Sequence, residues 1–169
     1  MDLNPKLNVA PLIYKLYYFL NSMIIVDTRE QKPLWVDNII KQKLDEGDYT
    51  TEELYNIAHA ERKSGIDFYG SIIQGHARFR AEINRAIDKN LKFAIFVECP
   101  EETFYTKKFS GGYRLKASSI QLRKMLATMI VKYNLEIIWC KDREDMKILM
   151  LEWFKKIKKK EKEIELITN

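Results

Sequence analysis

Residues 46–67 read EGDYTTEELYNIAHAERKSGID and contain the pattern that decides the fold. Successive side chains of a β-strand point to opposite faces, so in a strand over residues 57–63 Glu61 and Lys63 share one face and Arg62 faces the other way. If the segment at Asp48 forms a neighbouring antiparallel strand, Asp48 reaches the same face. Two carboxylates and an amine that converge in this way would form a site for a hard divalent cation and a water.

Three short motifs occur in this chain in the order seen in one known family. Gly47-Asp48 is followed by Glu61-Arg62-Lys63, Asp67 comes four residues after Lys63, and the upstream residues 26–30 read VDTRE. Together they resemble the GD...ERKxxxD signature and the VDxRE segment of the XPF family of structure-specific endonucleases. An isolated ExK pattern arises by chance in any charged protein, whereas three motifs in order, with every ionisable position filled, are a strong signal. The resemblance covers approximately residues 23–155.

The resemblance implies a fold, a reaction and a set of site residues. The family has a restriction-endonuclease-like fold, so we expect an α/β domain with a central mixed β-sheet flanked by helices. Its members hydrolyse phosphodiester bonds in branched DNA, such as 3′ flaps and forks, with Mg²⁺ or Mn²⁺. They also pair their nuclease domains, so the resemblance implies a homodimer, formed through the helices after Ile120. The positions that match the catalytic residues of the family are Asp27, Arg29, Asp48, Glu61, Arg62, Lys63 and Asp67, and the metal ligands expected among them are Asp27, Asp48 and Glu61.

The residue types in these motifs suit phosphodiester hydrolysis. The reaction needs a nucleophilic water near neutral pH and compensation for the charge that develops on the phosphate, and a bound Mg²⁺ or Mn²⁺ supplies both. Magnesium prefers oxygen ligands, which fits Asp and Glu rather than His and Cys. Lys63 is placed to orient or deprotonate the water, or to stabilise the developing charge, and the sequence leaves these roles open.

Two motif residues have more than one interpretation. Arg29 is expected either to pair with the ligand carboxylates or to bind a phosphate. Asp67 is expected to hold Lys63 or a metal-bound water in place. Its position after Ser64-Gly65, at the start of a helix, also fits an ordinary N-cap.

Three alternatives to a flap or fork endonuclease remain open. A Holliday-junction resolvase and a restriction-type nuclease are enzymes on the same fold. A DNA-binding subunit without cleavage activity is the alternative of another class. Such partner subunits typically lose acids of the GD and ERK motifs, whereas this chain keeps them.

Length and composition indicate one soluble domain with its own core. The chain has 169 residues, of which 46% are hydrophobic, 12% aromatic and 31% charged. The formal net charge is +5, but residues 155–162 alone carry six lysines and one glutamate. The rest of the chain is therefore formally neutral, and the basic pI gives only weak support for phosphate binding.

Cysteines, histidines and apolar runs exclude several classes of protein. Cys99 and Cys140 each end an apolar run and lie in no CxxC or Cys/His pattern, which predicts buried thiols in a reducing compartment. His59 and His76 are the only histidines, so a zinc site is not expected. No convincing secretory signal is present, and no apolar run approaches the ~20 residues of a membrane helix. These observations predict an intracellular protein that does not enter a membrane.

Alternating strand and helix patterns predict the order of the elements. We expect an N-terminal extension with a short helix over residues 1–22, an XPF-type nuclease domain over residues 23–155, and a lysine-rich helix end or tail over residues 156–169. Within the domain the patterns predict strands over residues 23–26, 57–63, 92–97 and 135–139. They also predict helices over residues 35–44, 68–88 with a kink or break at Gly75, 120–133 capped by Ser118 or Ser119, and 142–160.

Basic and aromatic residues outside the motifs suggest how DNA would be bound. Arg78 resembles an arginine common in the family, and Arg80 lies on the same predicted helix. The loop over residues 101–117 interleaves aromatic and basic side chains, a composition typical of single-strand and junction binders, although many such loops are merely solvated. The predicted DNA-binding residues are Arg78, Arg80, Lys107, Lys108, Tyr113, Arg114 and Lys116.

Overall fold

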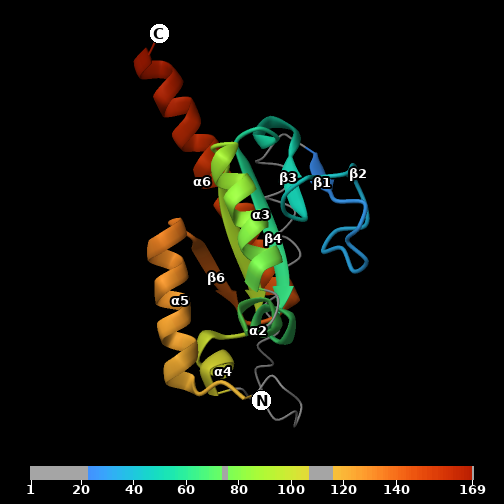
Figure 1. The fold of residues 1–169 in the computed structure, drawn as a ribbon. Coiled ribbons are helices and arrows are strands. Elements are labelled where there is room, and N and C mark those ends of the chain that lie inside the picture. The colour runs from blue at the N-terminus through green and yellow to red at the C-terminus, as the bar shows by residue number, and fades with distance from the viewer. Residues whose placement is uncertain (1–22, 74–75, 107–115, 169) are drawn as a thin grey trace, which may run out of the picture.

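The computed structural model describes residues 23–73, 76–106 and 116–168 (Figure 1). The predicted N-terminal extension, residues 1–22, lies outside the described residues. Six strands of the described chain form one sheet in the order β2-β1-β3-β4-β5-β6. Their bounds are β1 Ile24–Val26, β2 Ile39–Lys41, β3 Tyr49–Thr51, β4 Ala58–Ser64, β5 Lys92–Glu98 and β6 Glu136–Cys140.

The sheet is mixed, as the sequence predicts. β3 is antiparallel to both β1 and β4, so the two segments that carry Asp48 and Glu61 are antiparallel neighbours. The pairs β1 with β2, β4 with β5, and β5 with β6 are parallel. The parallel half therefore places the ends of β4, β5 and β6 at one edge of the sheet.

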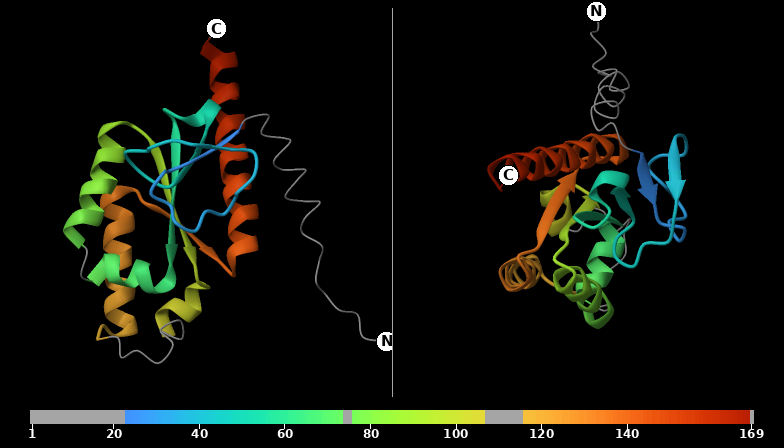
Figure 2. Two further views of the ribbon diagram at one scale, coloured as in Figure 1. Left: turned by 90° about the vertical axis from the view of Figure 1, so that its right-hand side faces the viewer. Right: turned by 90° about the horizontal axis from the view of Figure 1, so that it is seen from above.

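Helices cover both faces of the sheet (Figure 2). The long helix α6 packs on one face, together with residues Leu34 and Trp35. Helices α2, α3, α4 and α5 pack on the other face. The bounds are η1 Glu52–Leu54, α2 Gly65–Ile73, α3 His76–Asp88, α4 Glu101–Thr106, α5 Ser119–Tyr133 and α6 Arg143–Thr168.

The alternation of side chains in β5 explains why both faces need a covering layer. Ala94 and Phe96 belong to the core under α6, whereas Ile95 and Val97 belong to the core under α2, α3 and α5. All four side chains are fully buried. A strand that is apolar on both sides is stable only between two layers, as is usual for parallel strands.

β4 follows the same alternation with one difference. Ala58 and Ala60 point into the core under α6. On the other face, Glu61 and Lys63 take positions where β5 has apolar side chains, and they line a pocket instead of a core. The polar face of β4 therefore forms one wall of a pocket between the sheet and the helices α2 and α3.

The predicted helix over residues 35–44 is wrong. This segment contains β2, whose residue Ile39 pairs with Ile24 of β1, and Asn38 has a left-handed φ of 53° that no α-helix contains. Trp35 and Leu44 are nevertheless buried. The apolar spacing that suggested a helix marks residues that are buried, but it does not specify the backbone conformation. In so short a segment, the pairing of β2 with β1 overrides the weak helical pattern.

Two further segments differ from their predicted bounds. Residues 101–106, predicted as loop, form the short helix α4, which buries Phe104 and Tyr105, and α6 continues through Thr168 instead of ending at residue 160. The predicted break near Gly75 agrees with the end of α2 at Ile73 and the start of α3 at His76. The capping prediction is confirmed, because the Ser118 side chain accepts a hydrogen bond from the Gln121 backbone N–H at the start of α5.

No helix of residues 23–73, 76–106 or 116–168 combines the length and the apolar character needed to cross a membrane.

Candidate active site

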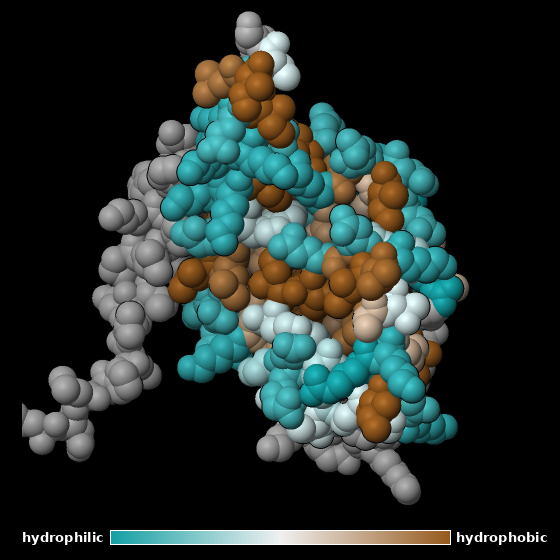
Figure 3. All heavy atoms as spheres, turned by 90° about the vertical axis from the view of Figure 1, so that its left-hand side faces the viewer, coloured by the Kyte–Doolittle hydropathy of each residue, from teal (hydrophilic) through white to brown (hydrophobic). Residues whose placement is uncertain are grey.

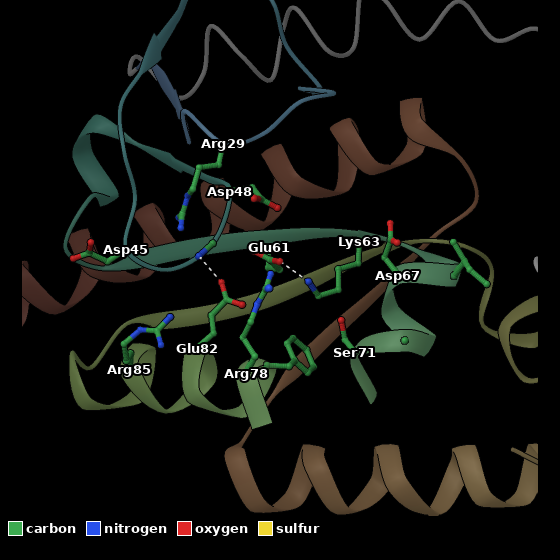
Figure 4. A pocket seen from close by; sticks show the side chains of 14 residues that line it. Arg29, Asp45, Asp48, Glu61, Lys63, Asp67, Ser71, Arg78, Glu82 and Arg85 are labelled. Carbon is green, nitrogen blue, oxygen red and sulfur yellow. Dashed lines mark hydrogen bonds and ion pairs between the residues drawn. The ribbon is translucent and has the colours of Figure 1, made fainter. Parts of the chain in front are cut away.

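A pocket of about 800 Å³ opens where β4, the turn before β3 and the helices α2 and α3 meet (Figure 4). The walls come from segments far apart in the sequence, and the sheet brings them together. Five acids and four basic residues line it, so its charges nearly balance. These residues are Asp45, Asp48, Glu61, Asp67, Glu82, Arg29, Lys63, Arg78 and Arg85.

Glu61 and Lys63 form a buried ion pair on the wall formed by β4. The Lys63 Nζ atom donates to Glu61 Oε1 at 2.6 Å, and only 14% and 9% of the two side chains are exposed. The Lys63 ammonium also lies 5.2 Å from the centre of the Phe79 ring. The face sharing predicted from strand periodicity is therefore confirmed.

The pocket shifts the ionisation of this pair. Burial, and after it the charge of Asp48, raise the pKa of Glu61 to about 8, against the opposing effect of the Lys63 charge. Burial works to lower the pKa of Lys63, but Glu61 outweighs it and the pKa of Lys63 is raised. Lys63 therefore remains a charged ammonium, whereas burial makes the charged form of the Glu61 carboxylate unfavourable.

Asp48 stands beside this pair on a turn built by glycine. Gly47 has a φ of +72°, and a Cβ atom at this position would lie 3.0 Å from the Ala60 carbonyl oxygen. The Asp48 N–H donates to that same oxygen at 2.9 Å, and Asp48 Oδ2 accepts from the Arg62 backbone N–H at 2.9 Å. Burial raises the pKa of Asp48 to about 6, while the Arg62 N–H lowers it.

The carboxylate of Asp27, the third predicted metal ligand, is bound by Arg29 and Leu44 rather than lining the pocket with Asp48 and Glu61. Its carboxylate accepts from Arg29 Nε at 2.8 Å and from the Leu44 backbone N–H at 2.6 Å. Its side chain is 1% exposed and does not line the pocket. Burial works to raise the pKa of Asp27, but these hydrogen bonds outweigh it and hold the pKa below its ordinary value.

The structure therefore brings together two of the three predicted ligand carboxylates. Asp48 and Glu61 share the pocket, whereas Asp27 reaches it only through Arg29, whose partly exposed guanidinium lies at the rim. Among the described residues, no group of three or more Asp, Glu, His or Cys side chains is arranged to hold a metal ion.

Arg62 points to the opposite face of β4, as strand periodicity predicts, and its side chain does not line the pocket. Its guanidinium pairs with Glu30 at 3.1 Å and Glu98 at 3.3 Å, and only 14% of the side chain is exposed. Arg143 of α6 lies 3.8 Å from the same Glu98 carboxylate. Arg62 thus ties the loop after β1 to β5, and it meets the pocket only through its backbone N–H to Asp48.

Replacement of Arg62 by Ala is expected to destabilise the fold by about 2–3 kcal/mol in urea denaturation. The change leaves the buried Glu30 carboxylate without its cation, and breaking a buried pair costs more than the pair contributes, although the partial exposure of Glu98 reduces the loss. The matched control is Lys159→Ala, which removes a largely exposed pair with Glu163 and should change stability by less than about 0.5 kcal/mol. Equal losses in the two variants would contradict the assignment.

Asp67 lies at the pocket but is not the N-cap of α2. The hydroxyl of Ser64 accepts from the Asp67 backbone N–H at 3.1 Å and donates to Asp67 Oδ2 at 2.6 Å. Ser64 therefore caps the helix and Asp67 belongs to its first turn. The Lys63 ammonium is paired with Glu61, so the expected Asp67–Lys63 contact is replaced by one with Ser64.

The three predicted DNA-binding residues that the structure describes lie at three separate places. Arg78 is exposed at the N-terminal part of α3 and lines the pocket. Arg80 lies beside Met125 and Met129 at a separate hollow between α3 and α5, and Lys116 lies at another, beside Ile73. Lys107, Lys108, Tyr113 and Arg114 lie outside the described residues.

Sequence reasoning missed Glu82. It lies four residues after Arg78 on α3 and lines the pocket with it. Its charge raises the pKa of Asp48 and of Glu61 and helps to raise that of Lys63, so it faces all three. The helical spacing of Arg78, Glu82 and Arg85 placed the three on one face of the helix, and this spacing was the signal available in the sequence.

A mixed six-stranded sheet between helical layers, with an acid and a lysine delivered to a pocket by a central strand, is the α/β architecture of an XPF-like nuclease domain. The chain belongs to the ERCC4-domain family of nuclease domains, since the family model matches residues 22–150. The resemblance stated from the three motifs is thereby confirmed.

Solved structures agree with this assignment of the fold. XPF from Aeropyrum pernix in complex with DNA superposes with a TM-score of 0.60 at 20% identity, over 82% of this chain and 66% of that one. A structure described as XPF from Aeropyrum pernix superposes with a TM-score of 0.58 at 20% identity, over 78% and 64%. This chain thus spans just under two thirds of the archaeal chains. A search of curated proteins finds no match.

Proposed function

We propose that this protein is a divalent-metal-dependent DNA endonuclease that hydrolyses phosphodiester bonds in branched DNA such as 3′ flaps and forks. The observation that carries the proposal is the pocket in which the half-buried carboxylate of Asp48 and the buried carboxylate of Glu61 lie beside the Lys63 ammonium. Family membership supports the reaction class. The shape of the DNA substrate is inferred from the family resemblance.

The donor atoms of the pocket fit Mg²⁺ or Mn²⁺. Magnesium retains several waters and is often held by one or two carboxylates together with substrate phosphates, so Asp48 and Glu61 suffice as protein ligands. Burial first, and neighbouring acids second, raise the pKa values of both carboxylates, and a bound cation would stabilise their charged forms. When bound, the metal would activate a water and compensate the charge of the phosphate. Asp27 is proposed to act on this site through Arg29 rather than as a direct ligand.

The other residues have roles that follow from their positions. Lys63 holds the Glu61 carboxylate at 2.6 Å and places a positive charge beside the reacting phosphate. Arg29 and Arg78, on opposite walls of the pocket, are proposed to bind the phosphates on either side of the scissile bond (Figure 4). Arg62 positions Asp48 through its backbone N–H.

We propose a homodimer formed through α5. This helix exposes Ile120, Ile130 and Val131 by 67%, 42% and 84%. The face of the molecule that carries α5 and the end of α6 shows a band of apolar residues across its middle (Figure 3). Exposed apolar patches of this kind mark protein interfaces. Sedimentation equilibrium should give twice the chain mass for the wild type and a lower mass for Val131→Asp; a monomeric wild type would exclude the dimer.

The test of the proposed activity is a panel of end-labelled 3′ flap, fork, four-way junction and linear duplex DNA. Each is incubated with the protein and Mg²⁺, Mn²⁺ or EDTA. We expect cleavage of the flap and fork near the branch, with either metal and not with EDTA. Preferred cleavage of the four-way junction would indicate a resolvase, and cleavage of the linear duplex a restriction-type nuclease. Binding without cleavage of any substrate would identify a DNA-binding partner subunit.

A further inference from the structure

Glu82 connects the helical wall of the pocket to the turn that carries Asp48. Its Oε1 atom accepts a hydrogen bond from the Gly47 backbone N–H at 3.3 Å, across 35 residues of sequence. Figure 4 shows this contact as a dashed line, with the Glu82 carboxylate between Arg78 and Arg85. No motif of the sequence includes Glu82.

Backbone hydrogen bonds attach Asp48 to the sheet. The Asp48 N–H donates to the Ala60 carbonyl at 2.9 Å, and the Asp48 carbonyl accepts from the Asp27 N–H at 2.8 Å. The positive φ of Gly47 directs its own N–H to the pocket side, where Glu82 accepts it. α3 also holds the preceding residue, because Arg85 pairs with Glu46 at 3.3 Å, but Glu82 is the α3 residue that accepts the Gly47 N–H next to Asp48.

Loss of the hydrogen bond between Glu82 and Gly47 would directly affect the position of Asp48. Asp48 directly follows Gly47, and its carboxylate lies in the same pocket as Glu61. The backbone of Gly47 already lies so close to Ala60 that a Cβ atom would stand 3.0 Å from its carbonyl oxygen. The turn therefore has no room to move closer to β4, so any displacement of Gly47 after the loss of Glu82 is expected toward the pocket.

We propose that Glu82 is a positioning residue for the metal-dependent hydrolysis proposed above, on which this inference rests. By accepting the Gly47 N–H from the opposite wall, it keeps the Asp48 carboxylate beside Glu61. A partner that orients a metal ligand in this way typically changes metal affinity 10–100-fold when it is removed.

Two substitutions separate this positioning role from a role of the charge itself. Glu82→Gln keeps an acceptor oxygen on a side chain of the same length and removes the charge, whereas Glu82→Ala removes both. The matched control is Asp88→Asn, which removes the charge of an exposed acid from the same helix outside the pocket. Thermal unfolding without metal shows whether each variant is folded.

The measurement is the Mn²⁺ dissociation constant of the full chain by isothermal titration calorimetry without DNA, followed by kcat and KM on the flap substrate. We expect Glu82→Ala to weaken Mn²⁺ binding by about 10-fold or more. Glu82→Gln and Asp88→Asn should stay within about 3-fold of the wild type. The loss in Glu82→Ala should appear in kcat rather than in KM, because DNA contacts are unchanged.

Two results would overturn the inference. If Glu82→Gln weakens Mn²⁺ binding as much as Glu82→Ala, the charge acts and the hydrogen bond does not. If Glu82→Ala binds Mn²⁺ like the wild type, the contact has no role. A wild-type protein that neither binds Mn²⁺ nor cleaves DNA would overturn the proposed function itself, so the two failures are distinguishable.

Discussion

Glu61→Gln is expected to reduce the rate of DNA cleavage by at least about 10³-fold. The substitution retains the shape of the side chain and an oxygen that accepts from Lys63, but it removes one of the two carboxylates proposed to hold the metal. A neutral amide is a poor ligand for a hard cation and leaves the Lys63 charge uncompensated. Single-turnover cleavage of the labelled flap with saturating Mg²⁺ measures the effect.

The same variant should remain folded, because its amide oxygen still accepts from Lys63 and the charged form of Glu61 is itself unfavourable when buried. Because burial raises the pKa of Glu61 to about 8 from 4.5, the folded protein binds a proton more tightly than the unfolded chain. In metal-free protein this group therefore lowers stability as pH rises from about 5 to about 8, by up to about 1.4 kcal/mol per pH unit. Urea denaturation across this range should show a flatter profile for Glu61→Gln.

The control for Glu61→Gln is Asp37→Asn, an exposed acid that lies outside the pocket. It should cleave at the wild-type rate. Wild-type cleavage by a folded Glu61→Gln would exclude Glu61 from the reaction and, with it, the proposed metal site. Loss of folding in Glu61→Gln would instead contradict the pH argument, which requires that the charged carboxylate is unfavourable in metal-free protein.

Lys63→Met is expected to reduce cleavage by about 10²–10³-fold with little change in DNA affinity. Methionine keeps an unbranched apolar stem against Phe79, from which the ammonium lies 5.2 Å, and removes the charge. The Glu61 carboxylate then loses its partner at 2.6 Å, and the transition state loses a nearby cation. Initial rates and DNA binding by fluorescence anisotropy separate the two effects.

A pH profile distinguishes the charge of Lys63 from a packing effect. The charge of Lys63 lowers the pKa of Glu61, so its removal should raise that pKa. The residual activity of Lys63→Met should therefore require higher pH than the wild type. The exposed Lys124→Met on α5 serves as the control and should change neither the rate nor the profile. Full activity in Lys63→Met would exclude an electrostatic role for the amine.

Local patterns were sufficient for the chemistry of β4. The alternation that sends Glu61 and Lys63 to one face and Arg62 to the other depends only on the period of a strand. The cap of α5 at Ser118 and the break between α2 and α3 around Gly75 are also local features. They were predictable because each involves residues within a few positions of one another.

Long-range contacts were beyond such patterns. The segment over residues 35–44 became β2 because it pairs with β1, and no local signal specifies that pairing. Glu82 reaches the pocket because α3 packs on the sheet beside the Gly47 turn, 35 residues away in the chain. The helical spacing showed which side chains share a face of α3 but not what that face would meet.

The sequence by itself determined the family, the mixed sheet and the identity of the ionisable groups, because spacing and residue type are properties of the chain. Only the tertiary structure decided which acids share one pocket. Asp27, Asp48 and Glu61 carry the same kind of carboxylate, but the Leu44 N–H and Arg29 hold Asp27 away from the other two. A carboxylate turns toward the donors that packing places around it. Arg29 lies two residues from Asp27, but the Leu44 N–H comes from a segment that the sequence does not place beside Asp27.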